Sequence, residues 1–236
     1  MRRDKVFMPF PKPQRDAIFL GRPQRFLAKM AFRNGTETVA YCANPGSFNG
    51  CLETGSDALL WDSQDPERKR RYTWRAIKLD GVWIGTDTHL ANRLVEQLLR
   101  QRLLPPLKAY EISKCEPLVR PGLRVDFLLT GPQGTCFLEV KSATVVENGL
   151  ARFPDSITPR GLRHLQGLTR MAKAGHRTVL LFVVQRGDAD TFAVSSHYPA
   201  FNKAFKKALA AGVEIIACAV EVSPEGFCKP RLLPVL

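Results

Sequence analysis

The sequence predicts an α/β (α+β) protein, in which a small all-β barrel is followed by a mixed sheet flanked by helices. Three observations lead to this fold class. Residues 17–86 contain short β-prone runs separated by turn residues, a pattern typical of a small all-β domain. Residues 88–104 carry a 3.6-residue apolar repeat, and predicted strands and helices alternate after it. Because the period changes at this point, we expect one domain over residues 1–87 and another over residues 88–236.

The first domain holds six predicted strands. Asn34-Gly35 separates the second run from the third, Asp80-Gly81 separates the last two, and both dipeptides are hairpin signals. The strands are expected over residues 17–20, 25–32, 37–42, 58–61, 72–79 and 82–84. These turns predict a barrel without fixing its type.

The second domain begins with a predicted helix over residues 88–104, which Pro105-Pro106 stops. The following helix has Thr158 as its cap and Pro159 at its first position. The expected elements are strands over residues 110–119, 123–130 and 135–145, a helix over 158–173, a strand over 178–185, a helix over 199–211 and a strand over 213–222. Their order, αβββαβαβ, predicts a mixed sheet with helices on its faces.

Two of these strands form a predicted hairpin. Gly131-Pro132-Gln133-Gly134 has the composition of a four-residue turn, which pairs Thr130 with Thr135. This register is favoured because a slip of one residue would mix the two faces of the strands. The apolar face then pairs Val125, Phe127 and Leu129 with Val140, Leu138 and Cys136.

The other face of the hairpin carries charge. The same register sets Asp126 opposite Glu139 and Arg124 opposite Lys141. Two carboxylates directly across a strand pair repel by about 0.2–1 kcal/mol, so we expect a cation between them or a proton on one. Mg²⁺ suits the pair, because it takes one or two carboxylates and completes its shell with phosphate oxygens. The Lys141 ammonium would lower the pKa of a metal-bound water, orient that water, or offset the charge that builds on a pentavalent phosphate. The alternative is a half-exposed surface with diagonal salt bridges between Arg124 and Glu139 and between Asp126 and Lys141.

Further residues are candidates for the same site. Arg160 and His164, four apart, share one helical face, where Arg160 would hold a phosphate and His164 would hydrogen-bond the substrate or orient the attacking water. Glu116 is a candidate third acid for the metal, and Asp155 is a candidate helix cap. A solvated basic helix face is the alternative for Arg160 and His164, and a surface position is the alternative for Glu116.

The chain is strongly basic, since 35 Lys and Arg against 22 Asp and Glu give a formal net charge of +13. This charge favours a polyanionic partner, nucleic acid first. Residues 68–75 hold five basic residues, two aromatic residues and no acid, a composition that suits phosphates and stacked bases. The candidate contacts are Arg68, Lys69, Arg70, Arg71, Tyr72 and Trp74, with Arg22, Arg25 and Lys29 as a second group. The alternative for residues 68–75 is a solvated basic turn that leads into a core tryptophan.

Other patterns narrow the class of protein. The six cysteines lie singly, without CxxC pairs or nearby histidines at zinc-ligand spacing, which favours reduced cysteines in a cytoplasmic protein. Residues 1–13 begin with basic residues but have three prolines and no apolar run, so we expect no secretory signal. No stretch approaches the roughly 20 apolar residues of a membrane span. The absence of Walker, dinucleotide-binding and serine-elbow motifs argues against those three enzyme classes.

The hairpin motif resembles the signature of the PD-(D/E)XK nuclease superfamily, since Asp126 is followed after twelve residues by Glu139-Val140-Lys141. From about residue 17 to 225 the chain also resembles the sugar fermentation stimulation protein A (SfsA) family. The matching segments are Arg25-Phe26-Leu27-Ala28, Asn44-Pro45-Gly46, Tyr72-Thr73-Trp74, Ala91-Asn92-Arg93-Leu94, Arg124-Val125-Asp126-Phe127, Glu139-Val140-Lys141-Ser142, Phe153-Pro154-Asp155, Arg160-Gly161 and His164-Leu165. This resemblance implies DNA binding, an N-terminal OB-like barrel and a C-terminal nuclease-like domain.

The superfamily resemblance also implies roles for individual residues. The implied ligands of Mg²⁺ or Mn²⁺ are Asp126, Glu139 and the Val140 carbonyl, with Lys141 placing the nucleophilic water. Arg160 and His164 match a helix position where related nucleases often carry an auxiliary residue. The chain departs from the common pattern in the first helix, where Asn92-Arg93 stands near the place that an acid often occupies.

We therefore expect a DNA-binding protein of the sugar fermentation stimulation type, acting on double- or single-stranded DNA with a Mg²⁺-dependent nuclease site. One alternative is a non-enzymatic DNA-binding transcriptional regulator of sugar metabolism in which the site is vestigial. Another is an RNA-binding protein that uses the barrel. We expect a cytoplasmic protein without a membrane partner, and a homodimer is compatible with the sequence.

Overall fold

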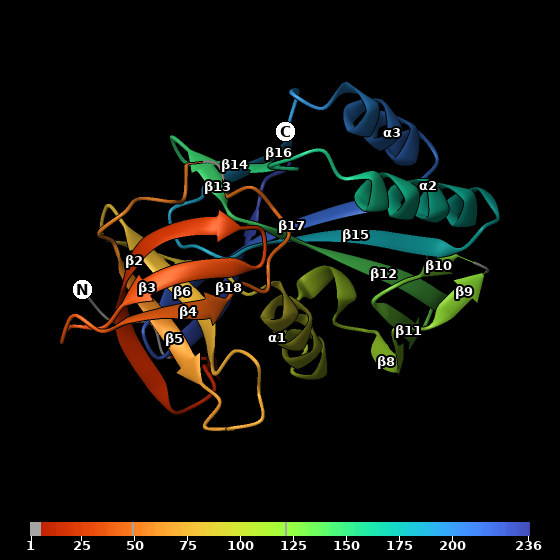
Figure 1. The fold of residues 1–236 in the computed structure, drawn as a ribbon. Coiled ribbons are helices and arrows are strands. Elements are labelled where there is room, and N and C mark those ends of the chain that lie inside the picture. The colour runs from red at the N-terminus through yellow and green to blue at the C-terminus, as the bar shows by residue number, and fades with distance from the viewer. Residues whose placement is uncertain (1–5, 49, 121) are drawn as a thin grey trace.

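The first part of the chain folds into a closed barrel (Figure 1). The computed structural model describes residues 6–48, 50–120 and 122–236, so the basic residues at the N-terminus lie outside the described residues. The strands here are β1 Met8–Pro9, β2 Gln14–Gln24, β3 Leu27–Ala31, β4 Glu37–Tyr41, β5 Asp57–Asp62, β6 Tyr72–Leu79 and β7 Val82–Gly85. Neighbours follow the order β4-β3-β2-β5-β6, and β4 also pairs with β6 at Tyr41 and Thr73, which closes a five-stranded barrel. The predicted OB-like barrel is confirmed.

Aromatic side chains fill the barrel. Trp74 is completely buried, and the ring of Phe19 stacks on it with a centroid distance of 5.1 Å. Phe48 packs against the same indole at 5.6 Å. Such aromatic pairs contribute about 0.5–1.5 kcal/mol beyond the area they bury. Trp74 is therefore a core residue of the barrel.

The second part of the chain forms a mixed sheet with helices on both faces. Its elements are α1 Thr88–Arg100, η1 Pro105–Leu107, β8 Glu111–Cys115, β9 Leu118–Arg120, β10 Leu123–Arg124, β11 Phe127–Gly131, β12 Gly134–Ala143, β13 Val145–Glu147, β14 Leu150–Phe153, α2 Pro159–Lys173, β15 Arg177–Val184, β16 Thr191–Val194, α3 Pro199–Ala210, β17 Glu214–Ser223 and β18 Gly226–Leu233. Strands β12, β15 and β17 run parallel, whereas β11 is antiparallel to β12 and β8. The predicted mixed sheet is confirmed.

Helix α1 covers one face of this sheet, and α2 and α3 cover the other (Figure 1). Leu94 and Leu98 of α1 belong to the same buried cluster as Leu138 of β12. On the opposite face, Leu165 and Leu168 of α2 belong to a second buried cluster. Each fully buried leucine contributes roughly 1.5–3 kcal/mol. No helix among the described residues is long and apolar enough to span a membrane.

Several element boundaries differ from the prediction. Helix α1 ends at Arg100, four residues early, because Arg102 adopts a left-handed conformation with φ of 57° and Pro105 follows. Glu116, with φ of 49°, divides the predicted strand 110–119 into β8 and β9. Strands β13, β14, β16 and β18 are additional, and the short ones carry too few residues for a periodic signal.

The hairpin has the predicted register but is shorter than predicted. Thr130 pairs with Thr135 and Phe127 with Leu138, and the ladder stops there. The chain before Phe127 turns away, so that β10 pairs with β9. Three expected pairings are therefore not part of the ladder. Val125 packs in the cluster on the α2 side and not against Val140. Asp126, which was expected opposite Glu139, precedes the first paired residue of β11.

The expected pairing of Arg124 with Lys141 is also absent from the ladder. Its guanidinium Nη1 donates to the carbonyl oxygen of Glu116 at 2.7 Å. Lys141 pairs with Glu139 on its own strand. The diagonal salt bridges of the alternative reading are thus not formed by these side chains.

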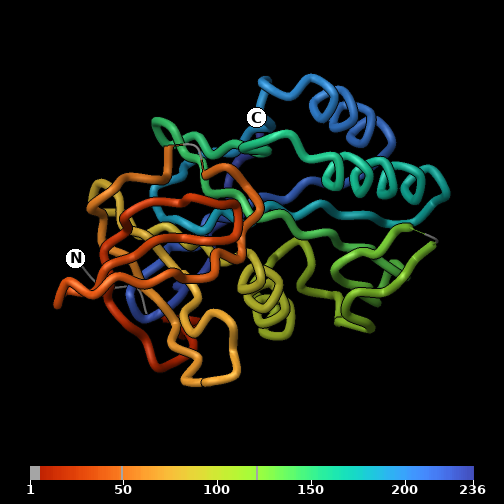
Figure 2. The backbone as a smooth tube through the Cα atoms, viewed as in Figure 1, coloured from red at the N-terminus to blue at the C-terminus, as the bar shows by residue number. Residues whose placement is uncertain are grey.

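A loop of the barrel docks on the second domain. Ser47 Oγ donates to the carbonyl oxygen of Asp155 at 2.9 Å, and the Phe48 N–H donates to Asp155 Oδ2 at 3.1 Å. In Figure 2 this loop, in orange, lies against the green segment that precedes α2. The prediction that Asp155 caps the helix is wrong, because Thr158 Oγ1 accepts the Gly161 N–H at 3.1 Å. Asp155 instead holds the two parts of the molecule together.

Gly46 in this loop has no room for a side chain, because a Cβ there would lie 2.5 Å from Asp155 Oδ2. We expect Gly46→Ala to destabilise the protein by about 1–3 kcal/mol through overpacking. For a chain of this size the melting temperature would fall by roughly 2–4 °C per kcal/mol. Thermal unfolding followed by circular dichroism measures the change, with Pro45→Ala in the same loop as the control. An unchanged melting temperature for Gly46→Ala would show that the loop does not press on Asp155.

Candidate active site in the cleft between barrel and sheet

A cavity of about 990 Å³ lies between the barrel, α1, β12 and the start of α2. Asp126, Glu139 and Lys141 line it, so the structure brings the three motif residues together. The barrel contributes Arg25, and α2 contributes Arg160. The cleft thus joins the predicted metal site to two of the predicted phosphate contacts.

Glu139 is the most buried acid of the cleft, with 2 % of its surface exposed. Its Oε1 contacts the Lys141 ammonium and lies 2.5 Å from His164 Nδ1. Burial by itself raises the pKa of Glu139, but the nearby Lys141 and His164 outweigh it, so the pKa lies below its usual value. The side chain is therefore held as a carboxylate.

Asp126 lies beside Glu139 at the point where the chain leaves the ladder. Its Oδ2 accepts the backbone N–H of Val140 at 2.7 Å, and its Oδ1 accepts Asn92 Nδ2 at 2.8 Å. Burial and then the Glu139 charge raise the pKa of Asp126 above its usual value, although the Val140 N–H lowers it in part. The two carboxylates thus have pKa values that their surroundings push apart, which is frequent at functional sites.

The donor set fits a hard divalent cation. Glu139 Oε2 is buried and makes no hydrogen bond within the described part of the chain. A buried carboxylate oxygen without a partner is costly, and a cation bound to it would remove that cost. The described residues contain no group of three or more His, Cys, Asp or Glu side chains placed to hold a metal. Two neighbouring carboxylates suit a divalent ion that takes few protein ligands and keeps several waters.

Glu116 is not placed with the two carboxylates as a side-chain ligand. Its side chain is exposed, although it lines the same cavity. Its contact with Asp126 is through the backbone, where the Glu116 N–H donates to the Asp126 carbonyl at 2.8 Å. Glu116 therefore helps to fix the chain at Asp126, and its predicted metal contact remains a prediction.

Helix α2 brings His164 to the site and Arg160 to its rim. Thr158 and Pro159 begin this helix as predicted, and one turn later His164 reaches Glu139. Arg160 is exposed in the first turn and lines the cavity. His164 contacts the acid and Arg160 faces the opening, so the two predicted helix residues have different surroundings.

Sequence reasoning assigned no role to Asn92, although it had marked the position as one where an acid often occurs. Its side-chain amide donates to Asp126 from the second turn of α1. Two arginines that line the cavity, Arg93 from α1 and Arg152 from β14, were also not among the residues predicted from the sequence. The only signal for these residues was the basic composition of the chain, which does not reveal which cations face the acids.

Several residues of the basic run at 68–75 have structural contacts within the barrel. Arg71 forms two hydrogen bonds to the buried Asp62, at 2.6 and 2.8 Å. Arg68 donates to Thr73 Oγ1 at 3.0 Å. Trp74 is completely buried and its Nε1 donates to the Ala76 carbonyl, so the prediction that it stacks on bases is wrong.

The remaining predicted contacts of the barrel differ in availability. Tyr72 is partly buried, with its ring edge-to-face against Phe32 at 5.3 Å. Lys69 is exposed and Arg70 is half-buried, so both stay candidates for a polyanion. Lys29 is exposed and pairs with Glu37 at 2.7 Å.

Arg22 has a structural contact that its predicted phosphate role did not anticipate. Its guanidinium donates to the carbonyl oxygens of Gly46 at 2.6 Å and Asn44 at 2.7 Å, and also to that of Arg25. These bonds hold the docking loop, residues 44–48, against the β2–β3 turn. Arg22 therefore supports the wall of the cleft, and Arg25 lines it.

Comparison with known proteins decides the family. Residues 89–226 match the family model described as "Sugar fermentation stimulation protein RE domain", and residues 20–86 match that described as "SfsA N-terminal OB domain". The chain belongs to the SfsA family. The SfsA resemblance seen in the sequence is thereby confirmed.

SfsA relatives match this chain over nearly its whole length. The sugar fermentation stimulation protein homolog of Geobacter sulfurreducens is 41% identical over 232 residues, which cover 97% of this chain and 99% of the relative. That of Ruegeria sp. (strain TM1040) is 40% identical over 231 residues, covering 96% and 100%. The structure of Pyrococcus furiosus SfsA in complex with Ca²⁺ superposes with a TM-score of 0.90 at 29% identity, covering 98% of this chain and 99% of that one.

Proposed function

We propose that this SfsA protein binds DNA in the cleft and hydrolyses its phosphodiester bonds with a divalent metal ion. The observation that carries the proposal is the buried Glu139, whose Oε2 has no hydrogen-bond partner among the described residues, in a cleft that Asp126 and several arginines also line. The Ca²⁺ in the Pyrococcus furiosus relative supports a divalent metal site in this family. For this chain we propose Mg²⁺ or Mn²⁺ as the ion that supports cleavage.

The proposed ligands of the ion are Asp126, Glu139 and the Val140 carbonyl. When bound, a divalent ion neutralises charge on the phosphate and lowers the pKa of water. The protein keeps Glu139 ionised through Lys141 and His164, so the carboxylate is ready to bind. Asn92 and the Val140 N–H fix the orientation of Asp126, as partners of ligands commonly do.

Lys141 is the residue proposed to place the nucleophilic water. Its ammonium has three N–H donors, and one of them is directed to Glu139. The residue also lines the cavity. A second donor is available to a water or to a phosphate oxygen. Phosphoryl transfer depends mainly on positioning and on electrostatic stabilisation, and a fixed ammonium supplies both.

The substrate backbone is proposed to contact the arginines around the cleft. Arg25, Arg93, Arg152 and Arg160 line the cavity, and none of them takes part in a salt bridge found among the described residues. Guanidinium groups bind phosphates through paired donors. Lys69 and Arg70 would extend this contact over the barrel.

The test is cleavage of plasmid and single-stranded DNA by purified protein with Mg²⁺ or Mn²⁺, beside Asp126→Ala. We expect cleavage that needs the ion and is lost in the variant. Equal cleavage by both proteins would remove the nuclease proposal. Competition between DNA and RNA at fixed salt decides whether DNA is the preferred partner, because phosphate contacts alone do not discriminate.

A non-enzymatic regulator is the second candidate. The contacts of Lys141 and His164 with the same oxygen of Glu139 favour it. A cluster of paired buried charges of this kind also occurs as a structural feature without a catalytic role. This candidate predicts ordinary DNA affinity without turnover at any metal concentration. A crystal soaked in Mn²⁺ with no ion near Glu139 would support it.

His164 is expected to act as a positioning residue through Glu139. We expect His164→Ala to lower metal-dependent cleavage about 10–100-fold, the usual cost of removing a partner of a metal ligand. DNA affinity without metal should stay unchanged, because the imidazole faces the acid. Cleavage rates against metal concentration test this, since a lost partner of a ligand raises the concentration of metal needed.

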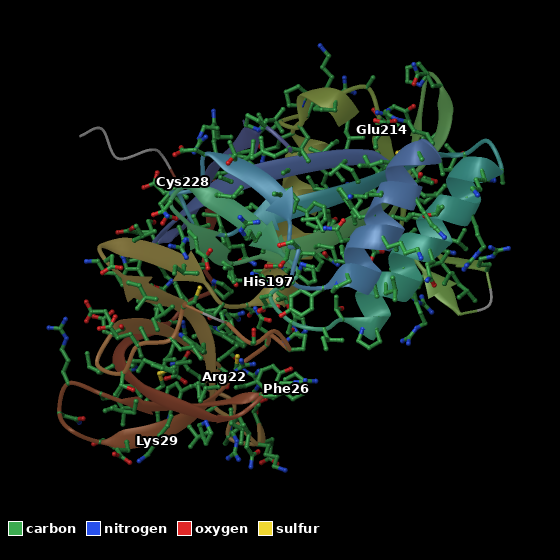
Figure 3. All side chains as sticks on the ribbon, turned by 90° about the horizontal axis from the view of Figure 1, so that it is seen from above. Arg22, Phe26, Lys29, His197, Glu214 and Cys228 are labelled. Carbon is green, nitrogen blue, oxygen red and sulfur yellow. The ribbon has the colours of Figure 1, made fainter. Side chains whose placement is uncertain are left out.

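His197→Ala is the matched control, because His197 is exposed in the segment before α3 (Figure 3). The control should cleave at the rate of the unchanged protein. Full activity of His164→Ala at every metal concentration would exclude a positioning role.

A further inference from the structure

The cleft also holds an aromatic pair that the metal site does not use. Phe26 lies in the turn between β2 and β3 with 45 % of its surface exposed. Its ring stacks on that of Tyr41, with a centroid distance of 6.5 Å and an interplanar angle of 23°. Both side chains line the cavity that contains Asp126 and Glu139. A single exposed phenylalanine is ordinary on a protein surface, but one stacked on a second ring inside a charged cleft presents a flat apolar face.

This pair is fixed in place by the backbone. The carbonyl of Phe26 accepts the N–H of Cys42, the residue after Tyr41, at 2.9 Å. The carbonyl of Arg25 accepts the guanidinium of Arg22, which also holds the docking loop. Figure 3 shows Arg22 and Phe26 next to each other at one end of the barrel. Because that loop is bonded to Asp155, the rings keep a fixed position relative to the acids.

Cations line the same cavity as the aromatic pair. Arg25 is the neighbour of Phe26 in the turn, and Arg93 lines the same cavity from α1; both are exposed. A flat ring with arginines beside it matches the chemistry of a nucleotide, whose base stacks while its phosphate pairs with guanidinium groups. Inside a duplex both faces of a base are covered by its neighbours, so a base there must leave the stack before it can stack on a protein ring.

We propose that Phe26 and Tyr41 form a stacking platform for an unpaired base, and that the cleft therefore takes single-stranded DNA or an unpaired end. This platform rests on the DNA binding in the proposed function, but it does not depend on cleavage. Arg25 and Arg93 contact the phosphates on either side of the stacked base. The strand then continues toward Asp126 and Glu139. The aromatic contact predicted from the sequence at Trp74 is thus supplied by Phe26.

The test is fluorescence anisotropy with three labelled probes in EDTA, where no metal-dependent cleavage occurs. The probes are an oligothymidine, an oligomer of the same length with abasic sugars, and a duplex. We expect Phe26→Ala to weaken binding of the oligothymidine about fivefold or more, the usual effect of removing one stacked ring. Binding of the abasic oligomer, which keeps the phosphates but not the bases, should change less than about twofold.

Two variants serve as controls. Phe26→Trp keeps a flat ring and should restore oligothymidine affinity. Leu118→Ala removes another exposed apolar side chain, 62 % exposed on β9, and should leave all affinities unchanged. Both surface variants are expected to fold, which thermal unfolding checks.

The outcomes separate the two proposals. The platform is overturned if Phe26→Ala binds oligothymidine as tightly as the unchanged protein does. It is also overturned if the variant loses as much affinity for the abasic oligomer as for oligothymidine. Either result leaves DNA binding standing. Tighter binding of the duplex than of the oligothymidine also overturns it. If the unchanged protein binds none of the probes, the platform and the proposed DNA-binding function both fall.

Discussion

Replacing Glu139 with glutamine is expected to lower metal-dependent cleavage by about three orders of magnitude, equivalent to about 4 kcal/mol of transition-state stabilisation. The glutamine keeps the shape of the side chain but puts an amide NH₂ in place of one oxygen and removes the charge. The buried Oε2, which has no hydrogen-bond partner within the described residues, would no longer attract a cation. Lys141 and His164 would also lose their shared anionic partner. Single-turnover cleavage of a labelled strand measures the rate.

Glu214→Gln is the matched control for this change. Glu214 begins β17, pairs with Arg177 at 2.7 Å, and lies far from Phe26 in Figure 3. The control makes the same chemical substitution in a salt bridge whose residues do not line the cleft. It should cleave at an unchanged rate. If Glu139→Gln keeps a tenth or more of the rate while remaining folded, the carboxylate is not a ligand of the catalytic ion.

The acidic site was predictable because its signals are local. The turn at residues 131–134 and the alternation of apolar residues set the register, so Thr130 pairs with Thr135 as predicted. The break before Phe127 was not predictable, because the apolar pattern continues through Val125 while the backbone leaves the ladder. That break places Asp126 where its carboxylate accepts the Val140 N–H. The break in the ladder thus positions a residue of the site, and the apolar pattern of the strand does not signal it.

The basic run shows the opposite case. Composition correctly identified a strongly basic chain, but it could not show which cations already have partners. Arg71 is bound by Asp62, nine residues earlier in sequence and buried in the barrel wall. Tyr72 and Trp74 lie two residues apart on β6 and so share a face of the strand, and packing in the barrel core buries the ring of Trp74 completely. Counting charges therefore could not separate the side chains with structural contacts, such as Trp74, from exposed ones such as Lys69, whose polyanion contact stays a prediction.

Contacts between distant segments could not be predicted from a single sequence. Asn92 and Asp126 are 34 positions apart, and their hydrogen bond depends on how α1 packs on the sheet. Arg75 of β6 and Asp87, the cap of α1, form an ion pair between the barrel and the second domain. A buried arginine within a strand is an exception to the usual pattern, so the sequence offered no reason to place it inside.

Removing the Asp87 carboxylate is expected to destabilise the protein by about 3–5 kcal/mol, because Asp87→Ala leaves the Arg75 guanidinium buried without its anion. The Arg75 side chain is 8 % exposed and that of Asp87 is 2 % exposed. The same substitution removes the cap of α1, whose Asp87 Oδ1 accepts the His89 N–H at 2.9 Å. The melting temperature should fall by roughly 6–20 °C, at about 2–4 °C per kcal/mol for a chain of this size. Differential scanning calorimetry measures the fall.

Two further variants assign the loss to the buried charge. Glu96→Ala on the same helix removes one partner of an exposed pair with Arg100 and should cost no more than about 0.5 kcal/mol. Adding Arg75→Leu to Asp87→Ala removes the unpaired guanidinium and should recover part of the stability, since apolar residues replace buried ion pairs well. A double variant as unstable as Asp87→Ala would assign the loss to the helix cap instead. Because α1 carries Asn92, which bonds Asp126, a loosened helix should also raise the metal concentration that cleavage requires.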